Sequence, residues 1–234
     1  MNLIFFDTET TSKDQGRLVQ IAWAINDTDI SCLSYIPAEP ISIEAMEIHG
    51  ITEEMVEKLP PFSISIEMFQ QMFNENYPIA HNAKFDIGVM QREGVFFGQY
   101  IDTLRVSQHV LPDMPAHRLQ YLRYALNLKP GENNTTAHDA AGDVAVLRQL
   151  YLYLEKKVDE LYPAPYGVDQ KTFTINKMLE LTQIPIMMTV IPFGKYKGHR
   201  FDEIMESDKQ DLRWLYQQPN LGDDLEATLK KYLD

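Results

Sequence analysis

The stretch Leu3-Ile4-Phe5-Phe6-Asp7-Thr8-Glu9 decides how the rest of this 234-residue chain is organised. Its four apolar residues predict a short buried strand, and its acidic residues come where that strand ends. Residues i and i+2 of an extended chain point to the same side of a sheet, so Asp7 and Glu9 direct two carboxylates at one point. Such carboxylates repel each other, and a hard cation such as Mg²⁺ or Mn²⁺ relieves that repulsion. The alternative is a solvated acidic strand end that binds nothing.

The residues that follow predict a mixed α/β fold. Further strands are expected over residues 18–25, 30–36, 77–80 and 100–102, and helices over residues 62–73, 83–92, 119–126 and 140–154. Two short helices, separated at Gly50, are expected between Ser42 and Met55. Strands at the start of the chain, followed by strands that alternate with helices, are typical of a mixed sheet with helices packed on it.

A change in composition after the last of these helices indicates a domain boundary. The segment Tyr162-Pro163-Ala164-Pro165-Tyr166-Gly167 contains two prolines and a glycine, which end a helix and favour a connection. We expect a first domain at residues 1–162, a linker at residues 163–175 and a small C-terminal domain at residues 176–234. Most of the acidic excess of the chain lies in the first domain.

Composition excludes several classes of protein. The chain has 21 basic and 34 acidic residues and a formal net charge of -13, so it has no basic coat that binds nucleic acid by bulk charge. The single Cys32 excludes a disulfide framework and a cysteine-based zinc site. The N-terminus lacks the basic segment of a signal peptide, and the longest apolar stretch, residues 184–193, contains two prolines. These features predict a cytoplasmic protein with no membrane partner.

Three more residues extend the acidic pattern. Asp86 lies about one turn into the helix expected after the strand at residues 77–80. His138 and Asp143 would point about 140° apart on one helix, so we expect His138 on the preceding loop and Asp143 on the helix itself. A histidine with a near-neutral pKa suits a general base beside metal ions. Alone, Asp86 could simply favour the helix dipole and His138 could be a surface residue, but the combined order Asp-x-Glu, Asp, His-x4-Asp favours one shared site.

The motifs around these residues resemble a known family, the DEDDh 3′→5′ exonucleases. The matching segments are Phe5-Phe6-Asp7-Thr8-Glu9-Thr10-Thr11, Ile48-His49-Gly50-Ile51-Thr52, His81-Asn82-Ala83-Lys84-Phe85-Asp86 and His138-Asp139-Ala140-Ala141-Gly142-Asp143. All five signature positions are filled, by Asp7, Glu9, Asp86, His138 and Asp143. Ser12 and Gln20 stand where many members carry Gly and Glu, and neither position binds metal in the family. The resemblance implies a ribonuclease H-like fold, with a mixed five-stranded sheet flanked by helices.

The resemblance also implies a chemistry and a cellular role. Asp7, Glu9, Asp86 and Asp143 would hold two Mg²⁺ or Mn²⁺ ions about 3.5–4 Å apart, and His138 would act as general base. The reaction would release nucleoside 5′-monophosphates from DNA 3′ ends, either single-stranded or in a frayed duplex, in the context of DNA repair. Glu9 and the backbone N–H of Thr10 would hold the terminal 3′-hydroxyl, and Asn82 would contact the terminal nucleotide.

The C-terminal part carries a second, weaker signal. Residues 193–198 and 212–215 are similar to the C-terminal portion of the exodeoxyribonuclease X branch of this family in bacteria. Basic residues alternate there with an aromatic residue and glycines, which lets backbone N–H groups approach phosphate and a ring stack on a base. The candidate DNA contacts are Lys195, Tyr196, Lys197 and Arg200. The alternative is a hairpin loop with basic decoration, and Trp214 with Leu212, Leu215 and Tyr216 is expected to form a small core.

Three other functions remain open from the sequence. The same chemistry could act on RNA, as in the RNase T and oligoribonuclease branches, because the pocket that senses the 2′-hydroxyl is not visible in the sequence. The chain could be a proofreading subunit of a polymerase, of the epsilon type. It could also be a non-catalytic nucleic-acid-binding module, although the five intact signature residues argue against that interpretation.

Overall fold

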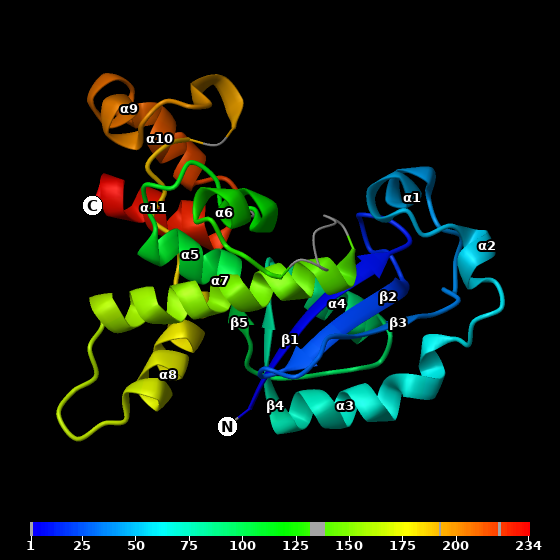
Figure 1. Cartoon of the computed structure of the whole chain (residues 1–234). Coiled ribbons are helices and arrows are strands. Elements are labelled where there is room, and N and C mark those ends of the chain that lie inside the picture. The colour runs from blue at the N-terminus through cyan, green and yellow to red at the C-terminus, as the bar shows by residue number, and fades with distance from the viewer. Residues whose placement is uncertain (1, 132–138, 192, 220) are drawn as a thin grey trace. The chain divides into compact units, whose positions relative to one another are not determined.

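The computed structural model describes residues 2–131, 139–191, 193–219 and 221–234 of the chain (Figure 1). These residues form two compact units, which divide after Thr182. The first unit contains the sheet and its flanking helices, and the second is a small helical unit. Every helix in these ranges is too short or too polar to cross a membrane.

A mixed sheet forms the centre of the first unit, in the order β3-β2-β1-β4-β5. Its strands are β1 (Asn2–Thr10), β2 (Leu18–Ile25), β3 (Ser31–Ser34), β4 (Asn76–Ala80) and β5 (Ile101–Asp102). Strand β1 pairs antiparallel with β2 and parallel with β4, and β4 pairs parallel with β5. The predicted ribonuclease H-like fold is therefore confirmed. Strand β1 is longer than predicted, because residues 8–10 keep pairing with β2 through an irregularity in register.

Helices cover both faces of this sheet. Helices α5 (Thr103–Val110) and α7 (Ala140–Leu161) pack on one face, and α3 (Ile66–Glu75) and α4 (Ala83–Arg92) pack on the other. The other helices of the unit are α1 (Ile43–His49), α2 (Glu53–Val56), α6 (Leu119–Ala125) and α8 (Gln170–Gln183), and the 3₁₀ turn η1 (Phe62–Ser65) precedes α3. Gly50 ends α1 with a φ of 72°, a conformation that favours glycine, so the predicted break is confirmed. Helix α5 was not predicted from the sequence.

Successive side chains of β1 point to opposite faces of the sheet and so contribute to two separate hydrophobic cores. Leu3 and Phe5 pack with residues of α5, α7 and α8, whereas Ile4 and Phe6 pack with residues of α3 and α4. Because successive side chains of a strand point to opposite faces, the acidic pair at positions 7 and 9 continues on the face of α7. Thr8 continues on the face of α4. Strand β1 thus reaches both layers of helices with its last residues.

Helix α8 belongs to the first unit, which differs from the division expected from the sequence. Ile175, Met178 and Leu181 are buried in the core that contains α7, and Gln170 donates a hydrogen bond to Asp159 of α7 at 2.9 Å. The expected linker at residues 163–175 therefore includes the first turns of a packed helix. The prolines do end α7, but they mark a connection between two helices of one unit, and the unit boundary comes after Thr182.

The second unit contains η2 (Gly194–Tyr196), α9 (Phe201–Ser207), α10 (Lys209–Tyr216) and α11 (Asp223–Leu233). Its core is built from Ile191, Phe201, Ile204, Leu212, Leu225 and Leu229. The sequence placed Trp214 and Tyr216 in this core, and that prediction is wrong: 62% of Trp214 and 37% of Tyr216 are exposed. Two residues along a helix turn a side chain by about 200°, so Trp214 cannot share the buried face of Leu212.

Candidate active site

The carboxyl ends of three strands meet at one edge of the sheet, because β1, β4 and β5 run parallel. Strand β1 brings Asp7 and Glu9 to this edge, and α4, which follows β4, brings Asp86 in its first turn. Helix α7 packs on β1 and contributes Asp143, also in its first turn. Asp86 and Asp143 are buried, with 3% and 8% of their surface exposed. Four carboxylates that the sequence separates are thus brought to one region.

Asp86 is fixed to strand β1 by two hydrogen bonds. Its Oδ1 accepts from the backbone N–H of Thr8 at 3.0 Å and from the Thr8 hydroxyl at 2.7 Å. Thr8 can reach Asp86 because it points to the α4 face of the sheet, between the two acidic residues that point to the α7 face. The middle residue of Asp-Thr-Glu therefore has a structural task, which is to join the third carboxylate to the first two.

The turn from β4 into α4 is held by a carboxylate that the sequence analysis missed. Asp102, at the end of β5, accepts hydrogen bonds from the backbone N–H groups of Asn82 at 3.0 Å and Leu104 at 2.9 Å. Asn82 has a φ of 64°, the left-handed conformation that asparagine tolerates. An acidic residue at a strand end is the signal that identified Asp7, and Asp102 shows the same signal.

Asp143 is held from the other side by Gln120 of α6, whose side-chain amide donates to Asp143 Oδ1. The segment that leads into α6 is anchored by His81, whose Nε2 lies 2.7 Å from the carbonyl oxygen of His117. Burial lowers the pKa of His81 to about 4, so its ring is neutral and donates from Nε2 to that carbonyl. Both contacts use residues outside the predicted set.

The acidic groups act strongly on one another. Burial, followed by the charges of Asp86, Asp143, Glu9 and Asp139, raises the pKa of Asp7 well above its usual value. Burial, followed by the charges of Asp143, Asp86 and Asp139, raises the pKa of Glu9 from 4.5 to about 8. Burial also raises the pKa of Asp86, against the lowering effect of the Thr8 hydrogen bonds. Ionising all of these groups together is therefore costly unless positive charge is supplied.

This donor set fits a hard divalent cation, which prefers carboxylate oxygens. In the described ranges, no three His, Cys, Asp or Glu side chains already lie close enough together to hold one ion. Mutual repulsion keeps charged carboxylates apart, and a dication would draw them together. The remaining predicted site residue, His138, lies outside the described residues.

A pocket of about 270 Å³ opens beside Glu9 and Thr10. Its other walls include Lys13, Ile48 and Phe85. Ile48 is an apolar residue on α1, yet 53% of its surface is exposed, so it contributes little to the core. The sequence motifs contain Ile48 and Phe85 but predict no functional role for either residue. Their positions in the sequence could have indicated a role, because Ile48 directly precedes His49 and Phe85 directly precedes Asp86.

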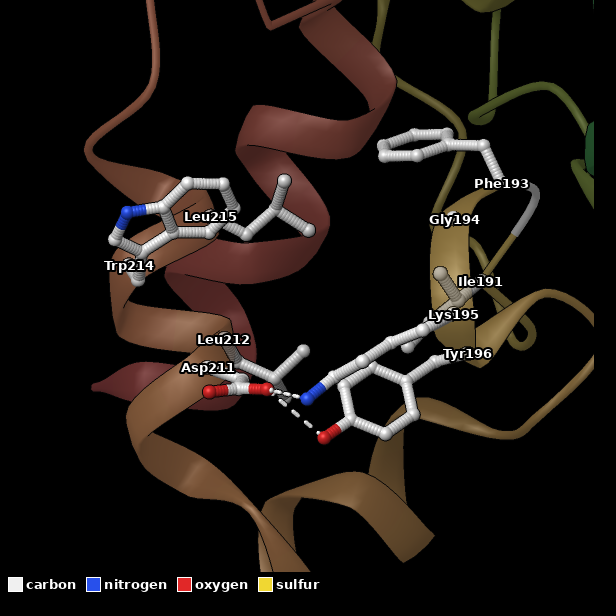
Figure 2. A pocket seen from close by; sticks show the side chains of 9 residues that line it. All are labelled: Ile191, Phe193, Gly194, Lys195, Tyr196, Asp211, Leu212, Trp214 and Leu215. Carbon is white, nitrogen blue, oxygen red and sulfur yellow. Dashed lines mark hydrogen bonds and ion pairs between the residues drawn. The ribbon is translucent and has the colours of Figure 1, made fainter.

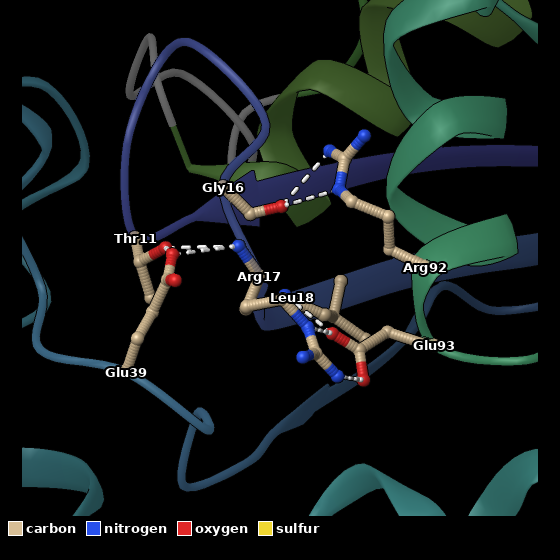
Figure 3. A network of polar contacts seen from close by, with 7 residues as sticks. All are labelled: Thr11, Gly16, Arg17, Leu18, Glu39, Arg92 and Glu93. Carbon is tan, nitrogen blue, oxygen red and sulfur yellow. Dashed lines mark hydrogen bonds and ion pairs between the residues drawn. The ribbon is translucent and has the colours of Figure 1, made fainter.

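The end of β1 and the loop that follows are fixed by His49 and by a polar network. His49 Nδ1 accepts from the N–H of Ile51 at 3.0 Å, so Nε2 carries the proton and donates to the carbonyl of Thr10 at 3.1 Å. Figure 3 shows how α4 secures the loop itself. Arg92 donates two hydrogen bonds to the carbonyl of Gly16, and Glu93 pairs with both nitrogens of the Arg17 fork at 2.8 and 2.9 Å.

Gly16 is required in this loop by close packing. A Cβ atom added there would lie 2.3 Å from the carbonyl oxygen of Ser12, which is backbone and cannot move aside cheaply. Arg17 continues the network on the other side, where its N–H donates to the hydroxyl of Thr11 at 2.8 Å. The loop that provides Ser12 and Lys13 to the pocket is therefore built as a fixed wall.

The predicted basic contacts belong to the second unit, whereas the four carboxylates belong to the first. Lys195 forms an ion pair with Asp211, and Arg200 forms one with Asp202 at 2.8 Å. The backbone N–H groups of residues 197, 198 and 199 donate to carbonyls of the same loop, so these three are not available to phosphate. Of the predicted set, Lys197 is the exposed cation for which the described residues provide no ion pair.

Fold and site together define a nuclease of the exonuclease family. The family model for the RNase T exonucleases, described as Exonuclease, matches residues 4–151, so the chain belongs to this family of hydrolases. Members of the family depend on divalent metal ions. The resemblance inferred from the sequence motifs is therefore confirmed.

Individual relatives extend the similarity beyond the family domain. Exodeoxyribonuclease 10 of Escherichia coli (strain K12) is 29% identical over 99% of both chains, which supports the branch inferred from the C-terminal residues. A structure of Exonuclease X in complex with 5′ overhanging duplex DNA shares the fold, with a TM-score of 0.60 and 24% identity over 77% of this chain and 99% of that chain. E. coli Exonuclease I in complex with a dT13 oligonucleotide has a TM-score of 0.59 and 18% identity, and covers 69% of this chain and 42% of that chain.

The raised pKa of Glu9 predicts a pH-dependent cost to stability. The folded protein holds this proton more tightly than the unfolded chain, so stability falls as the pH rises from about 4.5 through about 8. Glu9→Gln removes the ionisable group and should stabilise the metal-free protein at pH 8 by at least about 1 kcal/mol, or about 2–4 °C in Tm. The gain should shrink toward zero near pH 5, as measured by thermal unfolding in EDTA.

The matched control is Glu67→Gln, which changes an exposed carboxylate on α3. This variant should leave Tm unchanged at both pH values. A Glu9→Gln gain of equal size at pH 5 and pH 8 would contradict the assigned cause, because a packing effect would not depend on ionisation.

Proposed function

We propose that the protein is a 3′→5′ exodeoxyribonuclease that releases nucleoside 5′-monophosphates from DNA 3′ ends. The observation that carries this proposal is the convergence of four carboxylates beside a pocket that can hold a nucleotide. Asp7, Glu9, Asp86 and Asp143 supply hard oxygen ligands, and the pocket begins at Glu9 itself. DNA is favoured as substrate because a relative similar over the whole chain is an exodeoxyribonuclease, and two solved proteins of this fold contain DNA.

The four carboxylates would hold two Mg²⁺ or Mn²⁺ ions. When bound, such ions polarise a phosphate, lower the pKa of water and stabilise a departing oxygen. Asp86 and Asp143 are prepared for this role, because Thr8 and Gln120 already orient them. The ions would also solve a problem of charge, since a protein with a net charge of -13 repels a polyanion. Cations held in this site supply the missing attraction at the place where the phosphate must lie.

His138 is proposed as the general base. It would take a proton from the attacking water as the water oxygen bonds to phosphorus, and the bond from phosphorus to the 3′-oxygen of the penultimate nucleotide would break. The electron pair of that bond stays on the 3′-oxygen, which then takes up a proton from solvent. In the sequence, His138 directly precedes Asp139, the N-cap of α7, and stands five positions before Asp143.

The pocket beside Glu9 is proposed to hold the terminal nucleotide. Ile48 and Phe85 supply apolar surface for the base, while Glu9 and the Thr10 backbone N–H take the 3′-hydroxyl. Asn82, exposed at the start of α4, remains the proposed second contact to this nucleotide. A hydroxyl is present at the 3′ end of a strand and absent within it, so this arrangement restricts cleavage to ends.

Digestion of matched oligonucleotides tests the function directly. DNA and RNA of one sequence, labelled at the 5′ end, should be compared with Mg²⁺, with Mn²⁺ and in EDTA. We expect progressive shortening of DNA from its 3′ end, release of 5′-mononucleotides and no digestion in EDTA. Asp7→Asn should reduce digestion to background, because this carboxylate belongs to the proposed metal site.

Each alternative function has its own result in the same experiment. Faster digestion of RNA would assign the chain to the RNase T or oligoribonuclease type. Binding of DNA without any shortening would indicate a non-catalytic module. Preference for a mismatched primer end in a duplex over a free single strand would favour a proofreading role.

The role of His138 can be separated from binding. His138→Ala should lower the rate of DNA digestion by roughly 10²- to 10⁴-fold, the range for loss of a general base, and should leave the Kd for single-stranded DNA unchanged in EDTA. A normal turnover rate with Mg²⁺ would exclude His138 as the base. Loss of DNA binding with an unchanged rate at saturation would instead make it a substrate contact.

The nucleotide pocket predicts a difference between two isoleucines on one helix. Ile48→Ala should raise KM for short DNA several-fold, since base contacts to apolar side chains are lost. Ile43→Ala is the matched control, because Ile43 is also on α1, is 77% exposed and does not line the pocket. Equal effects of the two variants in steady-state digestion would show that the pocket does not hold the base.

A further inference from the structure

The second unit contains a cavity that neither its core nor the proposed catalytic reaction explains. This cavity of about 150 Å³ lies between the η2 segment and α10 (Figure 2). Phe193 and Tyr196 line it from one side, and Trp214 and Leu215 line it from the other. Leu212, which is buried in the core, forms part of the wall. The cavity is therefore an apolar space whose inner wall belongs to the folded core.

The aromatic rings at the cavity are more exposed than folding requires. Phe193 is 45% exposed and Trp214 is 62% exposed, although both are large apolar side chains. The unit already has its own aromatic packing, in which Phe201 stacks on Tyr232 at a centroid distance of 5.6 Å. Large apolar side chains that gather at one surface position indicate a binding site rather than a packing need.

The polar edge of the cavity is fixed by its own contacts. The hydroxyl of Tyr196 lies 2.6 Å from Asp208 and 2.9 Å from Asp211, and Lys195 pairs with Asp211. The Lys195 ammonium also lies 4.5 Å from the centre of the Tyr196 ring. The acidic groups at the edge are thus occupied by hydrogen bonds and a cation. The Tyr196 ring is held in place before any ligand arrives, so little side-chain entropy is lost on binding.

Two basic side chains next to the cavity residues form no ion pair with the residues that the structure describes. Lys197 follows Tyr196 and Arg213 precedes Trp214, and both are exposed. Lys195 and Arg200, in contrast, each form an ion pair. Exposed aromatic rings beside such cations are the combination that proteins use to bind single-stranded nucleic acid, because rings stack on bases and cations meet phosphates.

We infer that this cavity binds one unpaired base of single-stranded DNA, stacked on Trp214 and Phe193, with Lys197 and Arg213 at the adjoining phosphates. The inference rests on the proposed function, since a nuclease that digests single strands meets unpaired bases in every substrate. It also changes the residues expected to contact DNA: Lys197 stays, and the aromatic pair with Arg213 replaces the ion-paired Lys195 and Arg200. Stacking accepts every base, so the contact is independent of sequence.

A second contact on the same strand would raise the affinity for long substrates. When two sites bind one chain, the second binding event occurs at an effective concentration set by the segment between them. A substrate of one nucleotide has a single base and cannot occupy both sites. The cavity therefore predicts a KM that falls as the single strand becomes longer, without any change in the chemistry at the four carboxylates.

Tryptophan fluorescence tests the inference on the full-length chain. The chain has two tryptophans, and Trp23 packs on Phe69 in the first unit, so Trp23→Phe leaves Trp214 as the only indole. Titration with an oligothymidylate in EDTA, where no digestion occurs, should quench Trp214 saturably. Blunt duplex of equal length should quench it far less. Phe193→Ala in this background should weaken the affinity roughly tenfold, within the usual range for one stacked base.

Two further variants keep the result interpretable. Phe96→Ala removes an aromatic side chain in the first unit that is 59% exposed, and it should leave the titration unchanged. Lys197→Glu should reduce the slope of log affinity against log salt by roughly 0.7 or more, the value for one phosphate of a single strand. Circular dichroism checks that each variant is folded.

The outcomes separate this inference from the proposed function. Hydrolysis of thymidine 5′-monophosphate p-nitrophenyl ester with Mn²⁺ reports on the four carboxylates alone, because the ester contains one nucleotide. If the ester is hydrolysed but Trp214 is not quenched by DNA, or Phe193→Ala binds DNA normally, the inference is wrong and the proposed function stands. If Trp214 is quenched but neither ester nor DNA is hydrolysed, the proposed function fails. Saturable quenching by a phenylalanine-rich peptide instead of DNA would assign the cavity to a protein partner and overturn the inference.

Discussion

Desolvation and mutual repulsion of the acidic side chains at the end of β1 are the constraint around which the first unit is built. The pKa values of Asp7 and Glu9 are raised because burial and neighbouring acids oppose ionisation. The packing of the sheet and its helices offsets the free-energy cost of holding these acids together. Two features hold the groups in place despite it. The parallel pairing of β1 with β4 fixes the edge where the acids meet, and the Thr8 hydroxyl holds Asp86 at 2.7 Å. A site with this much unsatisfied negative charge is suited to capture dications and is unfavourable without them.

A second layer of residues supports these carboxylates from three directions. Asp102 secures the turn into α4, Gln120 holds Asp143, and His81 anchors the segment before α6. Each joins elements that are far apart in sequence, so the position of a catalytic oxygen depends on contacts between strands and helices rather than on its own loop. The ring of His81 is neutral, because a charged imidazole would place an unpaired ion in a buried region.

The parts of the fold and site that could be predicted from sequence are those set by local patterns. The apolar run before Asp7 predicted β1, the spacing of Asp7 and Glu9 predicted their common face, and Gly50 predicted the end of α1. What could not be predicted depends on partners distant in sequence. The prolines at positions 163 and 165 end a helix, but only the packing of α8 on α7 shows that no unit boundary lies there. The exposure of Trp214 likewise follows from which face of α10 meets the core, and the loop containing His138 remains a prediction.

Helix α4 joins two functions in one rigid body. Its first turn carries Asp86, and its last residue, Arg92, with Glu93 just beyond, grips the loop at Gly16 and Arg17 (Figure 3). Ten helical residues span about 15 Å, so the helix acts as a strut between the acidic site and the wall of the nucleotide pocket. Because both ends of the helix are tied, one rigid element sets the position of Asp86 relative to that wall. A nucleotide seated against that wall would therefore meet Asp86 at a separation that the length of the helix fixes.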